Sequence, residues 1–235
     1  MNRVFIPTAG IGDWRRRLAD PEKQWQREAS AFETAVSWEC AAGTPRGIPA
    51  SIAAVLDQDA DLRDSSLLLA LPEHKVPLPG GSRASQTDVW ALLRCPTGMV
   101  SMAVEGKAEE SFGETLETWQ KDASPGKAQR LAHLCEVLQV TSAFPANIRY
   151  QLLHRTASAL LEARRFGAAH AVMLVQAFRP TGDSFSDYQA FGQCLGISVG
   201  TGMLSRVPHH ANPRLHLGWA VSPLCSDPEI VRAAV

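Results

Sequence analysis

The chain has 235 residues, of which 45% are apolar and 20% are charged, and its formal net charge is −1. These values are typical of one globular domain, so we expect residues 1–235 to fold as a single unit and exclude a disordered chain. They also exclude a protein that is basic throughout. A nucleic-acid partner would therefore have to meet a local basic patch or a bound cation.

The cysteines and the apolar runs indicate the compartment. The five cysteines are widely spaced and form no C-x-x-C pair, which argues against a disulfide framework and a cysteine zinc knuckle. The first ten residues lack the long apolar core of a signal peptide, and no run approaches eighteen apolar residues. We therefore predict no leader, no membrane span and a cytoplasmic location.

The first third of the chain predicts mostly helices. We expect a short strand at Asn2–Pro7 and a short helix at Asp13–Leu18. Apolar residues at helical spacing predict two further helices at Ser30–Ala42 and Ile48–Leu56. The period then changes, and the short apolar run Ser66–Leu71 is typical of a buried strand.

A β-hairpin is the clearest local prediction. Two strand-like runs, Asp88–Arg94 and Met99–Lys107, flank the turn sequence Cys95-Pro96-Thr97-Gly98. Pro96 and Gly98 cannot easily continue either strand, so they set its ends.

Helices and strands alternate after the hairpin. The expected elements are, in chain order, helices at Glu114–Lys121, Lys127–Leu138 and Ile148–Phe166, a strand at Ala169–Phe178, a helix at Ser184–Leu195 and a strand at Arg214–Val221. The strand at Ala169–Phe178 is apolar almost throughout, which indicates a place inside a sheet that is covered on both faces. The whole pattern predicts an α/β fold with a mixed central sheet flanked by helices.

Three residues of the hairpin point to chemistry. Because a hairpin folds back on itself, Asp88 at its start should lie beside Glu105 and Lys107 at its end. Two carboxylates held close repel each other unless a cation lies between them, and Mg²⁺ takes oxygen ligands. Lys107 could then orient or deprotonate a water, or stabilise charge on a phosphate.

Asp88 followed by Glu105-Gly106-Lys107 resembles the D…(D/E)-x-K signature of the PD-(D/E)XK nuclease superfamily. The resemblance implies a restriction-endonuclease-like core and a Mg²⁺ (or Mn²⁺) site. In it Asp88 and Glu105 would be metal ligands and Lys107 the catalytic lysine. An acid from an early helix often joins such a site, and Glu39 is our candidate metal ligand. Thr87 stands where the family's signature has proline.

The resemblance also implies a polar residue on the helix after the hairpin. Gln151, Tyr150 or His154 could fill this place, and we name Gln151 as the catalytic candidate. The several helices between Lys107 and the next strand depart from the family's usual single helix. The segments PEHKVPLPGG, SQTDVWALLR and RYQLLHRTASALLEA further resemble a group of bacterial proteins of about this length without an assigned activity, over roughly Phe5–Val221.

Other readings stay open. The three hairpin residues could be a solvated charge pair on a surface hairpin, and Glu39 a solvated helix residue. Gly196–Gly200 matches G-x-S-x-G around Ser198, but a nucleophile elbow needs a preceding strand, and a helix is expected there.

Three more patterns have plain structural explanations. His209-His210 with His216 match no familiar zinc spacing, so we predict a loop at the first two. Gly200-Thr201-Gly202 lacks the lysine of a phosphate loop. Arg15–Arg17 and Arg164–Arg165 are the best basic clusters for a phosphate backbone, although each is also typical of a solvated helix face.

The sequence thus favours a divalent-metal-dependent nuclease that acts on DNA, with a homodimer as one possible form. The alternative is a non-catalytic binding or interaction protein on the same fold. A serine hydrolase that uses Ser198 is a distant third hypothesis.

Overall fold

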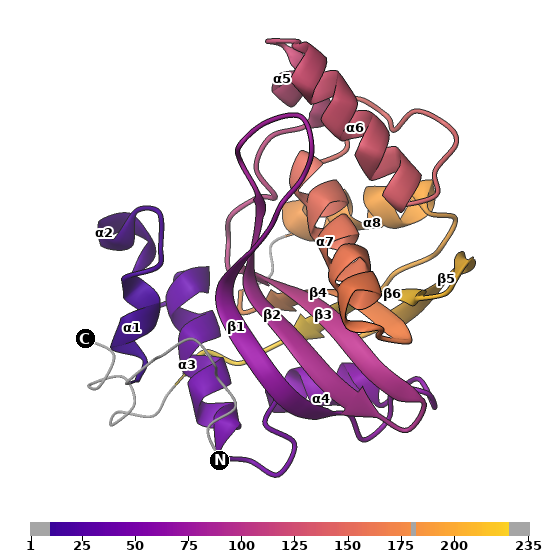
Figure 1. The fold of residues 1–235 in the computed structure, drawn as a ribbon. Coiled ribbons are helices and arrows are strands. Elements are labelled where there is room, and N and C mark those ends of the chain that lie inside the picture. Colours follow the sequence, from indigo (N-terminus) through magenta and orange to yellow (C-terminus); the bar gives the residue numbers. More distant parts are fainter. Residues whose placement is uncertain (1–9, 180–181, 226–235) are drawn as a thin grey trace.

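The computed structural model describes residues 10–179 and 182–225. At its centre lies one six-stranded sheet with the strand order β1-β2-β3-β4-β6-β5 (Figure 1). Its strands are β1 (Ser66–Val76), β2 (Ser85–Cys95), β3 (Gly98–Lys107), β4 (His170–Ala177), β5 (Leu204–Ala211) and β6 (Arg214–Val221). Strands β1 to β3 are antiparallel neighbours, β3, β4 and β6 run parallel, and β5 returns antiparallel to β6. The predicted mixed sheet is therefore confirmed.

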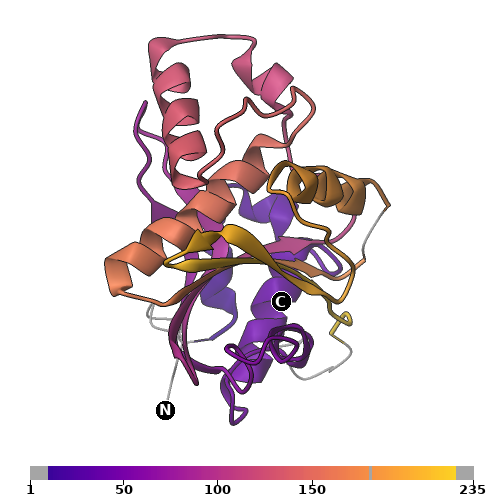
Figure 2. The ribbon, with the colours of Figure 1, turned by 90° about the vertical axis from the view of Figure 1, so that its right-hand side faces the viewer.

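Helices cover both faces of this sheet (Figure 2). They are α1 (Gly12–Arg15), α2 (Pro21–Gln24), α3 (Ser30–Ala42), α4 (Ala50–Leu56), α5 (Leu116–Gln120), α6 (Pro125–Val137), α7 (Tyr150–Phe166) and α8 (Gly182–Cys194). Helices α3 and α4 pack on one face, whereas α7 and α8 pack on the other. The long connection from β3 to β4 contains α5, α6 and α7, because two parallel strands need a crossover between them.

The strands alternate their side chains between two cores. Met102 and Val104 of β3 pack with α3 and α4, whereas Ala103 of the same strand packs with α7. Each large apolar side chain buried in this way contributes roughly 1.5–3 kcal/mol. The sheet is therefore fixed from both sides, which holds the ends of its central strands in place.

Most predicted elements are confirmed, with shifts at their ends. Helix α3 has the predicted bounds, and Gly167 ends α7 in the left-handed conformation with φ 64°. Strand β1 runs five residues beyond the predicted end at Leu71, because Pro72 lies in a strand at the edge of the sheet, where proline is tolerated. Helix α1 begins at Gly12 and ends earlier than expected. The strand predicted at Asn2–Pro7 lies outside the described residues.

Two elements were not predicted, namely α2 and the edge strand β5. The prediction of a loop at His209-His210 is wrong, since both residues lie in β5. This strand contains Pro208, its pairing with β6 is irregular between Val207 and Ala211, and most of its side chains are not buried. A strand of that kind lacks the period-2 pattern that reveals a strand in a sequence.

Within the described part of the chain, no helix is both long and apolar enough to cross a bilayer.

Candidate active site

Three carboxylates lie in one row across β1, β2 and β3. Pro72 pairs with Val89 and His74 with Thr87, so Glu73 and Asp88 lie at the same level of the sheet. Val89 in turn pairs with Val104, which places Asp88 level with Glu105. The register of three strands therefore gathers acids that are far apart in the sequence.

The row faces a small polar cavity of about 290 Å³. Its walls come from the segment around α1 and α2, the start of α3, the hairpin β2–β3 and the start of α7. They are formed by Leu18, Ala19, Gln24, Ser30, Ala31, Glu73, Gln86, Asp88, Glu105, Gly106, Lys107, Glu110, Gln151 and Arg155. The cavity thus lies at the end of β3, between helices on opposite faces of the sheet.

Gly106 allows the two layers to meet here. A Cβ at this position would lie 2.2 Å from Oγ1 of Thr34 on α3 and 3.3 Å from Oδ2 of Asp88. The backbone N–H of Gly106 also donates to Oδ2 of Asp88 at 2.7 Å. A glycine between Glu105 and Lys107 is therefore required by the close approach of α3 and by the position of the Asp88 carboxylate.

Glu105 is the centre of a buried ion network. Its Oε1 accepts from Nζ of Lys107 at 3.0 Å and from Nε2 of Gln151 at 2.7 Å, and its Oε2 accepts from Nε of Arg155 at 2.5 Å. The side chains of Glu105 and Lys107 are 4% and 5% exposed. The ammonium of Lys107 also lies 5.0 Å from the ring centroid of Phe112. These contacts hold a charged cluster that would be costly to bury unpaired.

The three acids of the row have different electrostatic environments. Burial raises the pKa of Glu105, but the positive charges of Arg155 and Lys107 outweigh it and hold that pKa below its usual value. Burial, together with the neighbouring charges of Glu105 and Glu73, raises the pKa of Asp88 well above its usual value. Burial raises the pKa of Glu73 to about 7, against the effect of its hydrogen bond from Gln86. The ionised form is therefore stabilised at Glu105 and disfavoured at Asp88 and Glu73.

Perturbed acids in a cavity, with cations beside them, are typical of catalytic sites.

A family model described as "Domain of unknown function (DUF6946)" matches residues 7–224. The chain belongs to this family. No curated protein and no solved structure matches the chain.

In this member of the DUF6946 family, four of the predicted site residues come together. Asp88, Glu105, Lys107 and Gln151 all line the polar cavity. Glu39 does not line it. Its Oε1 accepts from Nε1 of Trp14 at 2.7 Å, and eight residues of helix, about 12 Å, separate it from Ala31 at the cavity wall. This placement does not support Glu39 as a metal ligand.

The other candidates on α7 also lie outside the cavity. The ring of Tyr150 stacks on Trp119 with centroids 4.2 Å apart. His154 has Nδ1 2.8 Å from Oγ of Ser85, and burial lowers its pKa well below the usual value. A half-buried neutral histidine in this position supports the packing of α7 on β2.

The sequence interpretation missed Glu73 and Arg155, both of which line the cavity. Arg155 is four residues after Gln151 on α7, so helical spacing alone places it on the same face, and this signal was present in the sequence. Glu73 lies past the predicted end of its strand. Its backbone has φ 54°, an irregularity that no sequence pattern indicates.

The remaining motifs have structural roles. A nucleophile elbow requires a strand directly before its serine, whereas Ser198 comes directly after the helix α8. The carbonyl of Ser198 accepts a hydrogen bond from Oγ of Ser205. His210 contacts the carbonyl of Leu138, while His216 lies 3.3 Å from Oδ2 of Asp59. Among residues 10–179 and 182–225, no group of three or more His, Cys, Asp or Glu side chains could hold a metal ion.

A site for Mg²⁺ needs fewer protein ligands than such a group. This cation keeps several waters and is often held by one or two carboxylates together with substrate phosphates. Asp88 and Glu105 lie side by side on a cavity. Burial and the neighbouring acids raise the pKa of Asp88, and a bound cation would favour its ionised form. The residues present therefore fit a two-carboxylate Mg²⁺ or Mn²⁺ site, and they do not fit a closed zinc site.

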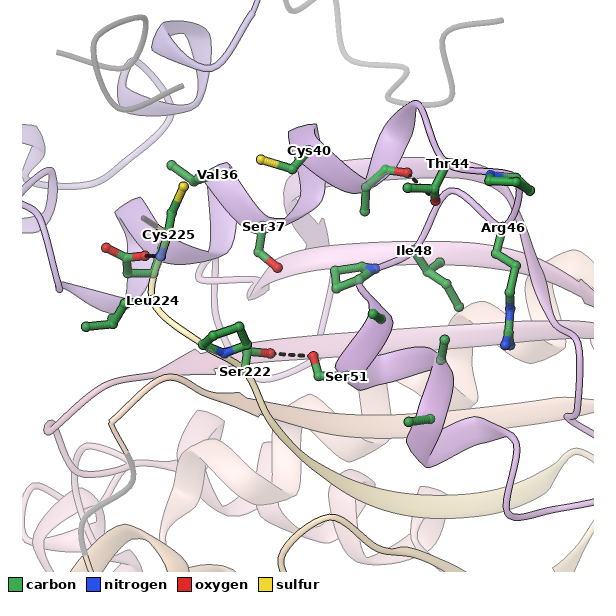
Figure 3. A pocket seen from close by; sticks show the side chains of 18 of the residues that line it. Val36, Ser37, Cys40, Thr44, Arg46, Ile48, Ser51, Ser222, Leu224 and Cys225 are labelled. Carbon is green, nitrogen blue, oxygen red and sulfur yellow. Dashed lines mark hydrogen bonds between the residues drawn. The ribbon is translucent and has the colours of Figure 1, made fainter. Parts of the chain in front are cut away.

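A second, larger cavity of about 850 Å³ lies away from this row (Figure 3). It is bounded by α3, the loop to α4, α4 itself and residues 222–225, and most of its wall is apolar. Ser51 and Ser222 meet there, with their hydroxyl oxygens 2.5 Å apart. Its acids are occupied: Glu33 accepts from two backbone N–H groups and Asp57 pairs with Arg46. We place the candidate active site in the smaller cavity because three acids share one row there, two of them have raised pKa values, and Lys107 and Arg155 lie beside them.

Proposed function

We propose that this chain is a divalent-metal-dependent nuclease that hydrolyses phosphodiester bonds, with DNA as its substrate. One observation supports this proposal above the others. Asp88 and Glu105 share a polar cavity with the buried Lys107, and in that cavity burial and neighbouring acids disfavour the negative charge of Asp88 and Glu73. An anionic substrate can be accommodated there when a cation offsets this charge.

Each residue has a role that follows from its contacts. Asp88 and Glu105 would hold Mg²⁺ or Mn²⁺, which when bound supplies positive charge at the phosphate and lowers the pKa of a water. Lys107 donates one hydrogen bond to Glu105, and an ammonium has three N–H donors, so others are available for a phosphate oxygen or the attacking water. Gln151 donates to the same Glu105 oxygen and fixes the orientation of that carboxylate.

The proposal extends to the setting of the reaction. A chain with net charge −1 attracts a polyanion through a local positive charge, which the bound cation supplies at the scissile phosphate. We place the protein in the cytoplasm, and a homodimer would allow two such sites to cut the two strands of a duplex.

A cleavage assay tests the proposed function. Purified protein is incubated with plasmid, linear duplex, single-stranded DNA and RNA in Mg²⁺, Mn²⁺ or EDTA. Lys107→Met keeps the volume of the side chain and removes its charge, so we expect cleavage by the parent protein in either metal and none by this variant. Lys121→Met, at an exposed position after α5, is the matched control and should cleave as the parent does. Folded parent protein that cleaves none of these substrates in either metal would contradict the proposal.

A non-catalytic binding protein is the second candidate, and one observation favours it. Both oxygens of Glu105 are already occupied by donors from Lys107, Gln151 and Arg155, as in a purely structural ion network. Such a protein would retain an oligonucleotide without cleaving it, in EDTA as well as in Mg²⁺. An enzyme would bind Mn²⁺ and lose this binding on Asp88→Asn.

A further inference from the structure

Arg155 contacts the carboxylate of Glu105, which is also a proposed ligand of the metal ion. Its Nε donates to Oε2 of Glu105 at 2.5 Å, and the arginine side chain is 10% exposed. Burial alone would lower the pKa of Arg155, but the charges of Glu105 and Asp88 raise it, so the guanidinium stays protonated. The cavity therefore contains a permanent cation in contact with one of the two proposed metal ligands.

This arrangement places two cations in competition. A divalent ion bound between Asp88 and Glu105 would meet the positive charge of Arg155 on the same carboxylate, in a poorly solvated site where like charges repel strongly. Lys107 already uses the other oxygen of Glu105. Metal binding is therefore opposed for as long as Arg155 remains on Glu105.

The other N–H donors of the Arg155 guanidinium make few hydrogen bonds inside the protein. An arginine has five N–H donors. Nη1 of Arg155 makes two long contacts, 3.5 Å to Oγ of Ser85 and 3.4 Å to Nδ1 of His154, and Nη2 has no hydrogen-bond partner among the described residues. Because Arg155 lines the cavity, a phosphate oxygen that enters it would find an arginine with donors to offer.

We propose that Arg155 is a positioning residue that exchanges Glu105 for a phosphate oxygen of the substrate. The exchange releases Glu105 to the divalent cation, so that metal and phosphodiester bind cooperatively and metal alone binds weakly. This inference rests on the proposed function. By linkage, the metal strengthens phosphate binding by the same factor as the phosphate strengthens metal binding.

The test is a Mn²⁺ titration followed by electron paramagnetic resonance, with and without a phosphorothioate dinucleotide that resists cleavage. For the parent protein we expect the dinucleotide to tighten Mn²⁺ binding by about fivefold or more, a typical coupling between sites. Arg155→Met should bind Mn²⁺ alone more tightly than the parent by a similar factor, and the dinucleotide should not tighten it further. Arg155→Gln, which removes the charge but can still donate to Glu105, should behave in the same way and serves if the first variant does not fold.

Two controls separate this inference from the proposal beneath it. Arg164→Met, at an exposed position of the same helix, should match the parent, and Asp88→Asn should abolish Mn²⁺ binding. If both charge-removing variants at Arg155 bind Mn²⁺ no more tightly than the parent, the inference is overturned while the metal site stands. If no protein binds Mn²⁺ under any condition, the proposed metal site fails and the inference fails with it.

Discussion

Replacing Glu73 by glutamine should stabilise the metal-free protein at neutral and higher pH. The pKa of Glu73 is raised from 4.5 to about 7, chiefly by burial and in part by the charge of Glu105. An acid with a raised pKa in the folded state costs stability once the pH exceeds its unfolded-state pKa, because folding then has to hold a charge in an unfavourable place. The introduced glutamine would still accept the hydrogen bond from Gln86 through its amide oxygen.

The magnitude follows from the size of the shift. Below about pH 4.5 Glu73 is protonated in both states, so Glu73→Gln should then change the free energy of unfolding little. The cost of the ionised Glu73 grows between pH 4.5 and 7 and is complete above about pH 7. The rise of this pKa from 4.5 to about 7 corresponds to at most about 3 kcal/mol.

Urea denaturation in EDTA at pH 4.5 and pH 8 measures this difference directly. We expect Glu73→Gln to raise the free energy of unfolding by about 1–3 kcal/mol at pH 8 and to leave it nearly unchanged at pH 4.5. Glu117→Gln, at an exposed position of α5, is the control and should have little effect at either pH. Equal effects of Glu73→Gln at the two pH values, or a loss of stability at pH 8, would refute the reasoning.

Two further substitutions test the surroundings of the site. Gly106→Ala should lower the free energy of unfolding by about 1–3 kcal/mol, because the new Cβ would overlap Oγ1 of Thr34. The control is Gly12→Ala, whose new Cβ meets no atom within 4 Å and should not destabilise the protein. Urea denaturation midpoints of the two variants measure the difference. Gln176→Leu should cost about 1–3 kcal/mol in the same assay, because it leaves the buried Nε1 of Trp38 without the acceptor it has at 3.1 Å. An unchanged denaturation midpoint in Gly106→Ala or in Gln176→Leu would contradict the packing described here.

The fold could be predicted wherever one physical signal dominated a segment. The hairpin was predictable because a turn sequence separates two strand-like runs, and α7 because its apolar period is long and ends at Gly167. Strand β5 could not be found, since its irregular pairing and exposed side chains remove the pattern on which prediction depends.

The site could be predicted as far as the hairpin extends. Register alone brings Asp88 level with Glu105, which the hairpin sequence already indicated. Glu73 belongs to the row only because β1 continues past Pro72, and Glu39 points to another contact because α3 carries it away from the cavity. Contacts between elements that are distant in the sequence depend on tertiary packing, so the local pattern of the sequence does not reveal them.

The most direct test of the central claim is a crystal structure of the protein grown with Mn²⁺, with anomalous diffraction data collected to locate the metal. The account predicts an anomalous peak in the polar cavity, within coordination distance of carboxylate oxygens of both Asp88 and Glu105, and no such peak for Asp88→Asn. A fully loaded crystal with no peak in this cavity, or with its peak on other residues alone, would contradict the assignment of this site.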